Sequence, residues 1–180
     1  MISSATERIQ TRREVVLALF SALAIGVHAL EVLMPLPLPW LRPGLANILT
    51  LCALFLYGTR AAWLVTLTRI GIGSLLLGTL FSPSFFLALS GGLTATALMT
   101  LARAVAGDRL SPIGVSVVGA SGHVIAQLSM AGWLLQHAGL WRLLPFLLLL
   151  ALVTGTINGV VADLLLERLR QRLAQFSAPS

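Results

Sequence analysis

Charged residues are scarce in this sequence: only 10% of its 180 residues are Asp, Glu, Lys or Arg, and Lys does not occur at all. Because soluble domains are usually about a quarter charged, this composition excludes an ordinary soluble protein. Instead, 57% of the residues are hydrophobic and the mean hydropathy is +0.94, which is typical of an integral membrane protein. The length leaves no room for a separate soluble domain, so we expect a single bundle of membrane helices.

Residues that bind metals, form disulfides or hold nucleotides are also few. Cys52 is the only cysteine, so neither an internal disulfide nor a thiol pair for metal or redox chemistry is possible. The three histidines, His28, His123 and His137, do not have a metal-ligand spacing. No GxxxxGK[ST] motif is present, so any ATP-driven step would belong to partners. We therefore predict no cofactor, no metal site and no catalytic residues.

The twelve basic residues are all Arg, and the formal net charge is +6. Nearly all of them lie at predicted helix ends, where they orient a protein in the bilayer, so we do not expect nucleic-acid binding. With the N-terminus inside, nine arginines are cytoplasmic, Arg42 and Arg142 are outside, and Arg69 is within the membrane. This distribution predicts a multi-pass membrane protein with both termini in the cytoplasm and an even number of spans.

Six hydrophobic stretches predict an all-α bundle of six transmembrane helices. The first, Val15–Met34, has 20 residues and as a helix would be about 30 Å long, which matches the hydrocarbon core. The others are 44–58, 61–81, 85–105, 112–135 and 143–166, and the second is short enough to be broken or re-entrant. The predicted organisation is a cytoplasmic N-terminal lead (1–14), one six-helix membrane domain (15–167) and a basic cytoplasmic tail (168–180).

Polar side chains follow one side of the fifth stretch, where Ser116, Ala120, His123 and Gln127 share a helical stripe. Such a stripe must face other helices or a polar cavity, because lipid cannot satisfy it. At about 1.5 Å per residue, we place Glu31, Asn47 and Gln127 in an outer layer and His123, Arg69 and Ser90 nearer the middle. Asn158 and Asp163 would reach the inner half. The pattern predicts an outward-facing substrate pocket, with these candidate binding residues: Glu31, Asn47, Arg69, Ser90, His123 and Gln127.

Each candidate also has a structural explanation. Arg69 could clamp a carboxylate or phosphate group of a ligand, or it could pair internally with Glu31 or extend towards the cytoplasmic face. His123 and Gln127 could line the pocket or form hydrogen bonds between helices. Glu31 could bind a cationic group, carry a proton or face interfacial water. Asn47 could touch the ligand or cap the start of its helix.

The first predicted helix has a second face made of small residues. Ala24, His28 and Glu31 share one stripe of this helix. Ala18, Ala22 and Gly26 lie roughly 120° away from that stripe, and small residues let another helix approach closely. This face serves either packing inside the bundle or docking of a partner subunit. Gly155 and Gly159 form a similar surface on the last helix, where we predict internal packing.

Four blocks of sequence carry a resemblance to a known family: GLANILTLCALFLYG (44–58), LTRIGIGSLLLGTLF (67–81), LSGGLTATALM (89–99) and SPIGVSVVGASGHVIAQL (111–128). In order and spacing they resemble the Gx transporter family, also labelled heptaprenyl diphosphate synthase component I. The resemblance extends from residue 15 to 166, and it implies a location in the bacterial cytoplasmic (inner) membrane. One departure is Val124, which stands where the family has an Asn after the His.

This family is similar in its six-helix plan to the substrate-binding S components of energy-coupling-factor transporters. By that likeness, Ala18, Ala22 and Gly26 would dock on an energy-coupling transport module. The Pro-rich segment 35–43 would form a lid over the pocket. The implied function is a membrane-embedded subunit that captures a small organic solute, such as a vitamin or an isoprenoid precursor, from the outer side.

The synthase label suggests an alternative function, a non-catalytic accessory membrane subunit of isoprenoid or quinone biosynthesis. The chain is not expected to be the catalyst, because elongating prenyl synthases need clustered Asp residues to hold magnesium on a diphosphate. Here the six acidic residues are never adjacent. A redox subunit is the least favoured function, since His28 and His123, the only candidate haem ligands, would lie at different depths.

Overall fold

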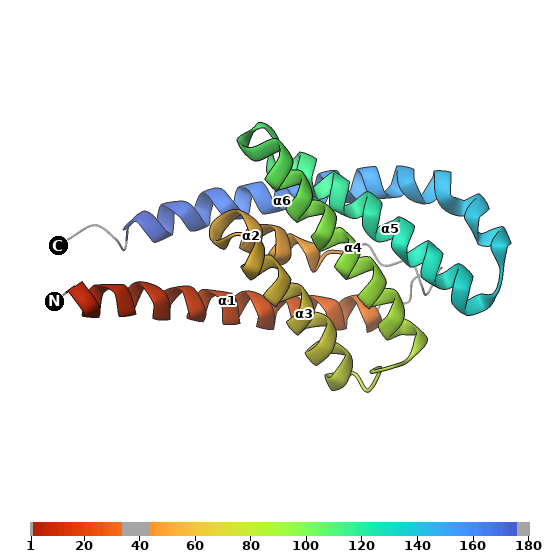
Figure 1. Ribbon diagram of the computed structural model, residues 1–180, viewed down its shortest axis with the longest axis horizontal. Coiled ribbons are helices and arrows are strands. Elements are labelled where there is room, and N and C mark those ends of the chain that lie inside the picture. The colour runs from red at the N-terminus through yellow and green to blue at the C-terminus, as the bar shows by residue number, and fades with distance from the viewer. Residues whose placement is uncertain (1, 34–43, 176–180) are drawn as a thin grey trace.

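A computed structural model describes residues 2–33 and 44–175, and the predicted lid at 35–43 lies outside them. The described residues form six α-helices and two short 3₁₀ turns, without strands (Figure 1). The helices are α1 (Ile2–Leu33), α2 (Asn47–Tyr57), α3 (Thr59–Leu76), α4 (Pro83–Ala106), α5 (Pro112–Leu135) and α6 (Leu144–Gln175). The turns are η1 (Gly107–Arg109) and η2 (Ala138–Leu143). The predicted boundaries at residues 14/15 and 167/168 both fall inside a continuous helix.

Local sequence explains where several helices begin and end. α4 and α5 each start with Ser-Pro: the Ser82 hydroxyl accepts a hydrogen bond from Phe85 N at 3.4 Å, and the Ser111 hydroxyl accepts one from Gly114 N at 3.3 Å. Proline fits the first turn because that position has no hydrogen-bond partner for an N–H. Between α2 and α3 the chain reverses at Gly58, whose φ of +85° favours glycine.

Four of the six helices are long and apolar enough to cross a membrane, counted over the described residues: α1, α4, α5 and the segment containing α6. α2 has 11 residues and is about 16 Å long, half of a hydrocarbon core of about 30 Å. α3 has 18 residues but includes Arg60 and Arg69. The all-helical architecture with six helices is confirmed, whereas four of the six predicted transmembrane spans are found in the described part of the chain, and α2 is too short to be a complete span. Because α2 is short, it begins about half-way through the bundle, and this sets the depth of the polar residues at its start.

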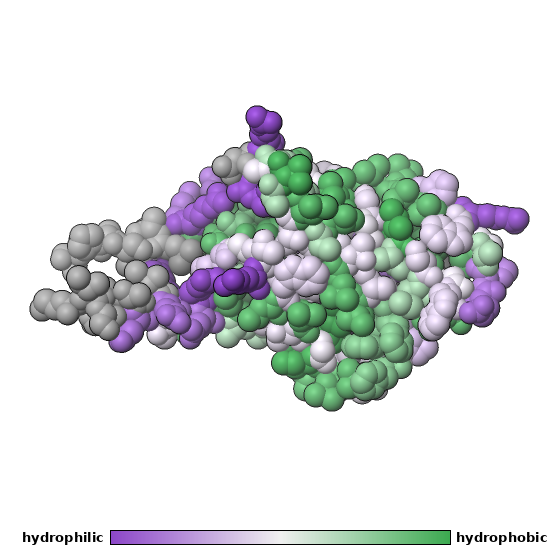
Figure 2. Space-filling model, viewed as in Figure 1, coloured by the Kyte–Doolittle hydropathy of each residue, from purple (hydrophilic) through white to green (hydrophobic). Residues whose placement is uncertain are grey.

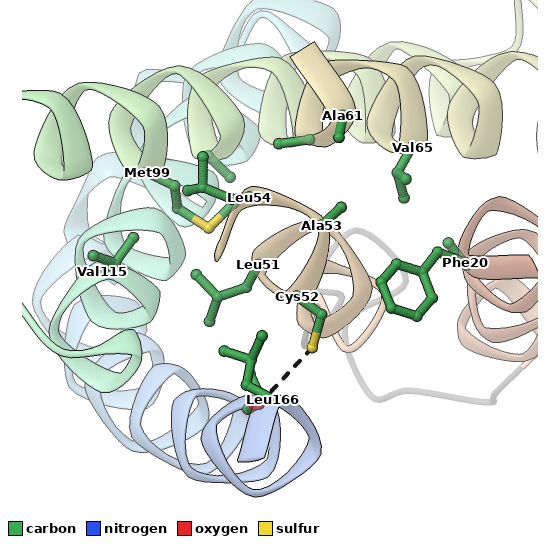
Figure 3. Close-up of a cluster of buried hydrophobic side chains, with 14 residues drawn as sticks. Phe20, Leu51, Cys52, Ala53, Leu54, Ala61, Val65, Met99, Val115 and Leu166 are labelled. Carbon is green, nitrogen blue, oxygen red and sulfur yellow. Dashed lines mark hydrogen bonds between the residues drawn. The ribbon is translucent and has the colours of Figure 1, made fainter. Parts of the chain in front are cut away.

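α2 is the centre of the molecule, and it contacts each of the other five helices. They form an open ring around it, since among the described residues the backbone of α1 lies next to α2 and α3 but not next to α4, α5 or α6. The core consists mainly of small and aliphatic side chains of α2 and of the helices that surround it (Figure 3). There Leu51 and Cys52 lie between Phe20 of α1 and Leu166 of α6, and the Cys52 thiol is 3.9 Å from the Ala162 carbonyl oxygen.

The outer surface matches an environment of lipid. Large apolar side chains are exposed along α1, α3 and α6, among them Leu23, Leu75 and Leu149, and a broad hydrophobic zone covers the middle of the molecule (Figure 2). Both termini lie at the same end (Figure 1). At that end the guanidinium of Arg13 stands over the Tyr57 ring, and that of Arg103 over the Phe55 ring. These features are those of an integral membrane protein.

Candidate functional site

The α2–α3 hairpin brings polar residues together in pairs. Asn47 and Arg69 each lie eleven residues from Gly58, and Thr50 and Thr66 each lie eight residues from it. Because helices rise equally per residue, such symmetric positions of an antiparallel hairpin lie at the same height. The Arg69 Nη2 accordingly donates to Asn47 Oδ1 at 2.6 Å, and the Thr50 and Thr66 hydroxyls are 3.1 Å apart.

Arg69 and Glu31 form the charged part of the site. Both side chains are 3% exposed, and the Glu31 carboxylate is near enough to act electrostatically on the guanidinium. Glu31 Oε1 also accepts a hydrogen bond of 2.5 Å from Leu45 N, just before α2. The Nε of Arg69 has no hydrogen-bond partner among the described residues. Internal charge compensation is therefore present, and one donor of the guanidinium is still unused.

A small cavity adjoins these groups. Its lining residues come from α1, α3, α4 and α5: His28, Glu31, Arg69, Ile70, Ala88, His123 and Gln127. The cavity volume is about 10 Å³, roughly the space that one water molecule requires. Seven side chains from four helices thus surround a space that in this structure is closed to a larger solute.

Glycines make this close approach of helices possible. A Cβ atom added at Gly91 of α4 would lie 2.8 Å from Cε1 of His123 and 2.9 Å from Cγ of Gln127. A Cβ at Gly73 of α3 would lie 2.9 Å from Cδ2 of His28. Side chains at either glycine would push a cavity-lining residue out of place.

Two amides of the site are incompletely hydrogen-bonded. Gln127 is 4% exposed, and neither Nε2 nor Oε1 of its amide has a partner among the described residues. Asn158 of α6 donates from Nδ2 to the Gly44 carbonyl oxygen at 3.5 Å, while its Oδ1 has no partner in the same part of the chain. Buried amides normally pair, so these groups are candidates for contact with a bound solute.

The sequence predicted most of these residues, but it placed some at the wrong depth. Asn47 was expected near the outer surface, and the structure places it level with Arg69 because α2 begins about half-way through the bundle. The predicted outer and middle layers of polar residues therefore lie at one level in the structure. Asn158 meets this layer through Gly44, instead of forming a separate inner group, and Asp163 is exposed. Ser90 donates to the Leu87 carbonyl oxygen of its own helix and does not line the cavity.

A comparison with protein-family models matched residues 20–165 to the family described as heptaprenyl diphosphate synthase component I. The chain belongs to this family. Searches of curated proteins and of solved structures gave no match. The family is the one that the four sequence blocks indicated.

Sequence reasoning missed one set of buried polar residues in this member of the heptaprenyl diphosphate synthase component I family. The Thr66 hydroxyl lies between those of Thr50 and Thr96, at 3.1 and 2.8 Å, and all three residues are fully buried. Thr66 is one helical turn from Arg69, so the three hydroxyls form a layer below the cavity. The equal spacing of the two α2–α3 pairs about Gly58 was a signal that could have revealed two of them.

His28 lines the cavity although it was not among the candidates. It shares the buried stripe of α1 with Glu31 and Ala24, as the helical period predicted. Among the described residues no group of three His, Cys, Asp or Glu side chains is placed to hold a metal ion.

The two small-residue surfaces have different environments. Ala18, Ala22 and Gly26 are exposed on α1, and a Cβ at Gly26 would meet no atom within 4 Å. In α6 a Cβ at Gly159 would lie 2.5 Å from Cα of Ile113 in α5. Internal packing is therefore confirmed for the α6 surface, while the α1 surface is free of contacts within the described part of the chain.

Proposed function

We propose that this protein is the membrane-embedded substrate-binding subunit of a transporter and captures a small polar organic solute. One observation carries the proposal: Arg69 and Gln127 line the same cavity, and the Arg69 Nε and both polar atoms of the Gln127 amide have no hydrogen-bond partner among the described residues. Unpaired buried polar groups are costly. A role in binding accounts for them better than a purely structural role does.

The position of the cavity supports entry from the outer side. Asn47 and Arg69 are eleven residues from the turn at Gly58, which is about 16 Å along a helix, and that turn lies at the end that holds both termini (Figure 1). The arginine distribution supports a cytoplasmic location for this end. In this proposal α2 and α3 complete a six-helix plan resembling that of S components, and the site opens in the half remote from the cytoplasm.

Opening of the site requires helices to separate, because the present cavity holds about one water molecule. We expect α1 to be the helix that moves, since among the described residues its backbone lies next to α2 and α3 but not next to α4, α5 or α6. Glu31 and His28 would move with it, away from His123 and Gln127. The exposed Ala18, Ala22 and Gly26 lie on the same helix, so a transport module docked there could control the opening.

Analysis of co-purified small molecules tests the proposal. The protein is isolated in mild detergent, denatured with organic solvent, and the released solutes are identified by mass spectrometry. We expect one solute per protein, reduced at least roughly tenfold in Arg69→Met because the guanidinium contact is lost. Arg60→Met is the matched control, since Arg60 is exposed at the α2–α3 turn. Stoichiometric release that is equal in both variants would contradict a role for Arg69.

The family description favours a second candidate, an accessory subunit of heptaprenyl diphosphate synthesis. The word component implies another subunit, and the exposed face of α1 offers a surface for one. In that case the purified protein would carry no stoichiometric solute and would co-purify with a prenyl-synthase subunit. Substitution of Ala22 by Leu would then abolish the association, whereas Arg69→Met would leave it intact.

A further inference from the structure

The Gln127 amide has a donor and an acceptor that the described part of the protein leaves unused. It lines the cavity at 4% exposure, and neither Nε2 nor Oε1 has a hydrogen-bond partner among the described residues. A primary amide offers its N–H and C=O side by side, and it can therefore bind a complementary pair of groups at two points. A role as hydrogen-bond glue between helices would require a protein partner for this amide.

Packing holds this amide in place. A Cβ atom added at Gly91 would lie 2.9 Å from Cγ of Gln127 and 2.8 Å from Cε1 of the His123 ring. The backbone of α4 at Gly91 is therefore close to both side chains. α4 thus presses directly on the stem of Gln127 and on the imidazole one turn before it. A fixed stem presents the amide in a defined orientation, which favours recognition by geometry.

The charges around the cavity oppose an anionic ligand. Apart from the two histidines, Glu31 and Arg69 are the ionisable residues among the described residues that line the cavity. Their formal charges, −1 and +1, cancel. Arg69 is already bonded to Asn47, and Glu31 to Leu45 N. A diphosphate would add at least two negative charges beside a buried carboxylate, with one guanidinium to compensate all of them.

We propose that the cavity binds an uncharged solute with a hydrogen-bond donor and acceptor side by side, as on the lactam or amide edge of a heterocycle. Gln127 would make the two-point contact, and the Arg69 Nε would donate to a further acceptor of the solute. This inference rests on the proposed substrate-binding function and specifies its ligand. It disfavours prenyl diphosphates and free phosphate as ligands of this site.

Ligand-detected NMR with three probes tests the proposal on the full chain in detergent: 2-pyridone, N-methyl-2-pyridone and inorganic diphosphate. The measurements are made at about pH 8, where an unperturbed imidazole is neutral. We expect saturable saturation-transfer signals from 2-pyridone, and signals at least roughly tenfold weaker from the N-methyl compound, which lacks the donor. Gln127→Leu should remove the 2-pyridone signal, and Ser129→Ala, an exposed site on the same helix, should retain it.

Each alternative result overturns the proposal. Equal binding of both pyridones, retention of the signal in Gln127→Leu, or absence of 2-pyridone binding would each exclude two-point recognition by this amide. Binding of diphosphate in preference to 2-pyridone would show an anion site instead. The proposed function fails separately, when no solute is released from the purified wild-type protein. A released anionic solute would preserve that function and refute the present inference.

Discussion

The two halves of the bundle differ in how their buried polar groups are satisfied. Around α2, the space between the other helices is filled by apolar side chains. The buried hydroxyls in this half are hydrogen-bonded to one another, Thr66 to both Thr50 and Thr96. Beyond the start of α2, the same ring of helices surrounds a cavity with unpartnered atoms on Arg69 and Gln127. One half is filled by packed side chains, whereas the other contains buried hydrogen-bonding atoms that have no partner among the described residues.

The largest loss of stability is expected from Arg69→Met, a substitution in the half that contains the cavity. It leaves the Glu31 carboxylate buried without its compensating cation, and breaking a buried charge pair from one side costs about 3–5 kcal/mol. The free energy of unfolding, measured by SDS titration in mixed micelles, should fall by a large part of this amount. The double variant Glu31→Gln/Arg69→Met should recover stability, since neither charge is then left alone. No recovery would contradict electrostatic coupling of the two residues.

Substitution of Gly159 by Ala tests the packing of α6 on α5. The added Cβ would lie 2.5 Å from the backbone Cα of Ile113, so the two helices must separate. Overpacking of this kind costs about 1–3 kcal/mol. Gly26→Ala is the matched control because the added Cβ meets nothing, and it should change stability by less than about 1 kcal/mol. Equal effects of both variants in the same titration would refute the close α5–α6 contact.

Thr66→Val tests whether the hydroxyl layer is structural. It removes the central member of the three and both of its hydrogen bonds, so we expect a loss of about 0.6–2 kcal/mol, the range for polar contacts between membrane helices. Solute retention should not change, because the layer lies below the cavity. Thr156→Val is the control, since the Thr156 hydroxyl is exposed and bonds only to its own helix at Leu152. Loss of solute without loss of stability would reverse the assignment.

The smallest effect on stability is expected from Gln127→Leu. Since the amide has no hydrogen-bond partner within the described residues, its removal breaks no hydrogen bond to them and should change the free energy of unfolding by less than about 0.5 kcal/mol or raise it. Solute retention should be lost at the same time. Thr66→Val is expected to lower stability and retain the solute, whereas Gln127→Leu should do the reverse. This contrast is the clearest test of the difference between the two halves. A loss of stability as large as that of Thr66→Val would indicate that Gln127 is structural.

Much of the site could be predicted from the sequence because helical periodicity is a local property. The stripe with His28 and Glu31 on α1 and that with His123 and Gln127 on α5 are both buried, as their spacing indicated. Ser90 was predicted from its depth alone, and its hydroxyl bonds within α4 instead. The depth of Ser90 in the membrane did not show in which direction its side chain points, so it was not sufficient to place this residue in the cavity.

The sequence indicated that the second helix is short, but it did not indicate the depth at which α2 begins. A hydrophobic stretch at 44–58 resembles a full span in composition, but the helix begins only at Asn47 and is half as long as the hydrocarbon core is thick. Asn47, Gly44 and Asn158 consequently meet at the level of Arg69. The relation between Thr66 and Thr96 likewise depends on how α3 and α4 face each other, which hydropathy does not encode.

By itself, the sequence determined that the protein is a bundle of membrane helices and which face of α1 and α5 avoids lipid. Hydropathy and the helical period act within one helix and need no neighbours. The tertiary structure alone decided which polar side chains share a cavity and which are already paired. Those outcomes depend on how deeply each helix enters the bundle, and here a short central helix surrounded by five others sets the depth.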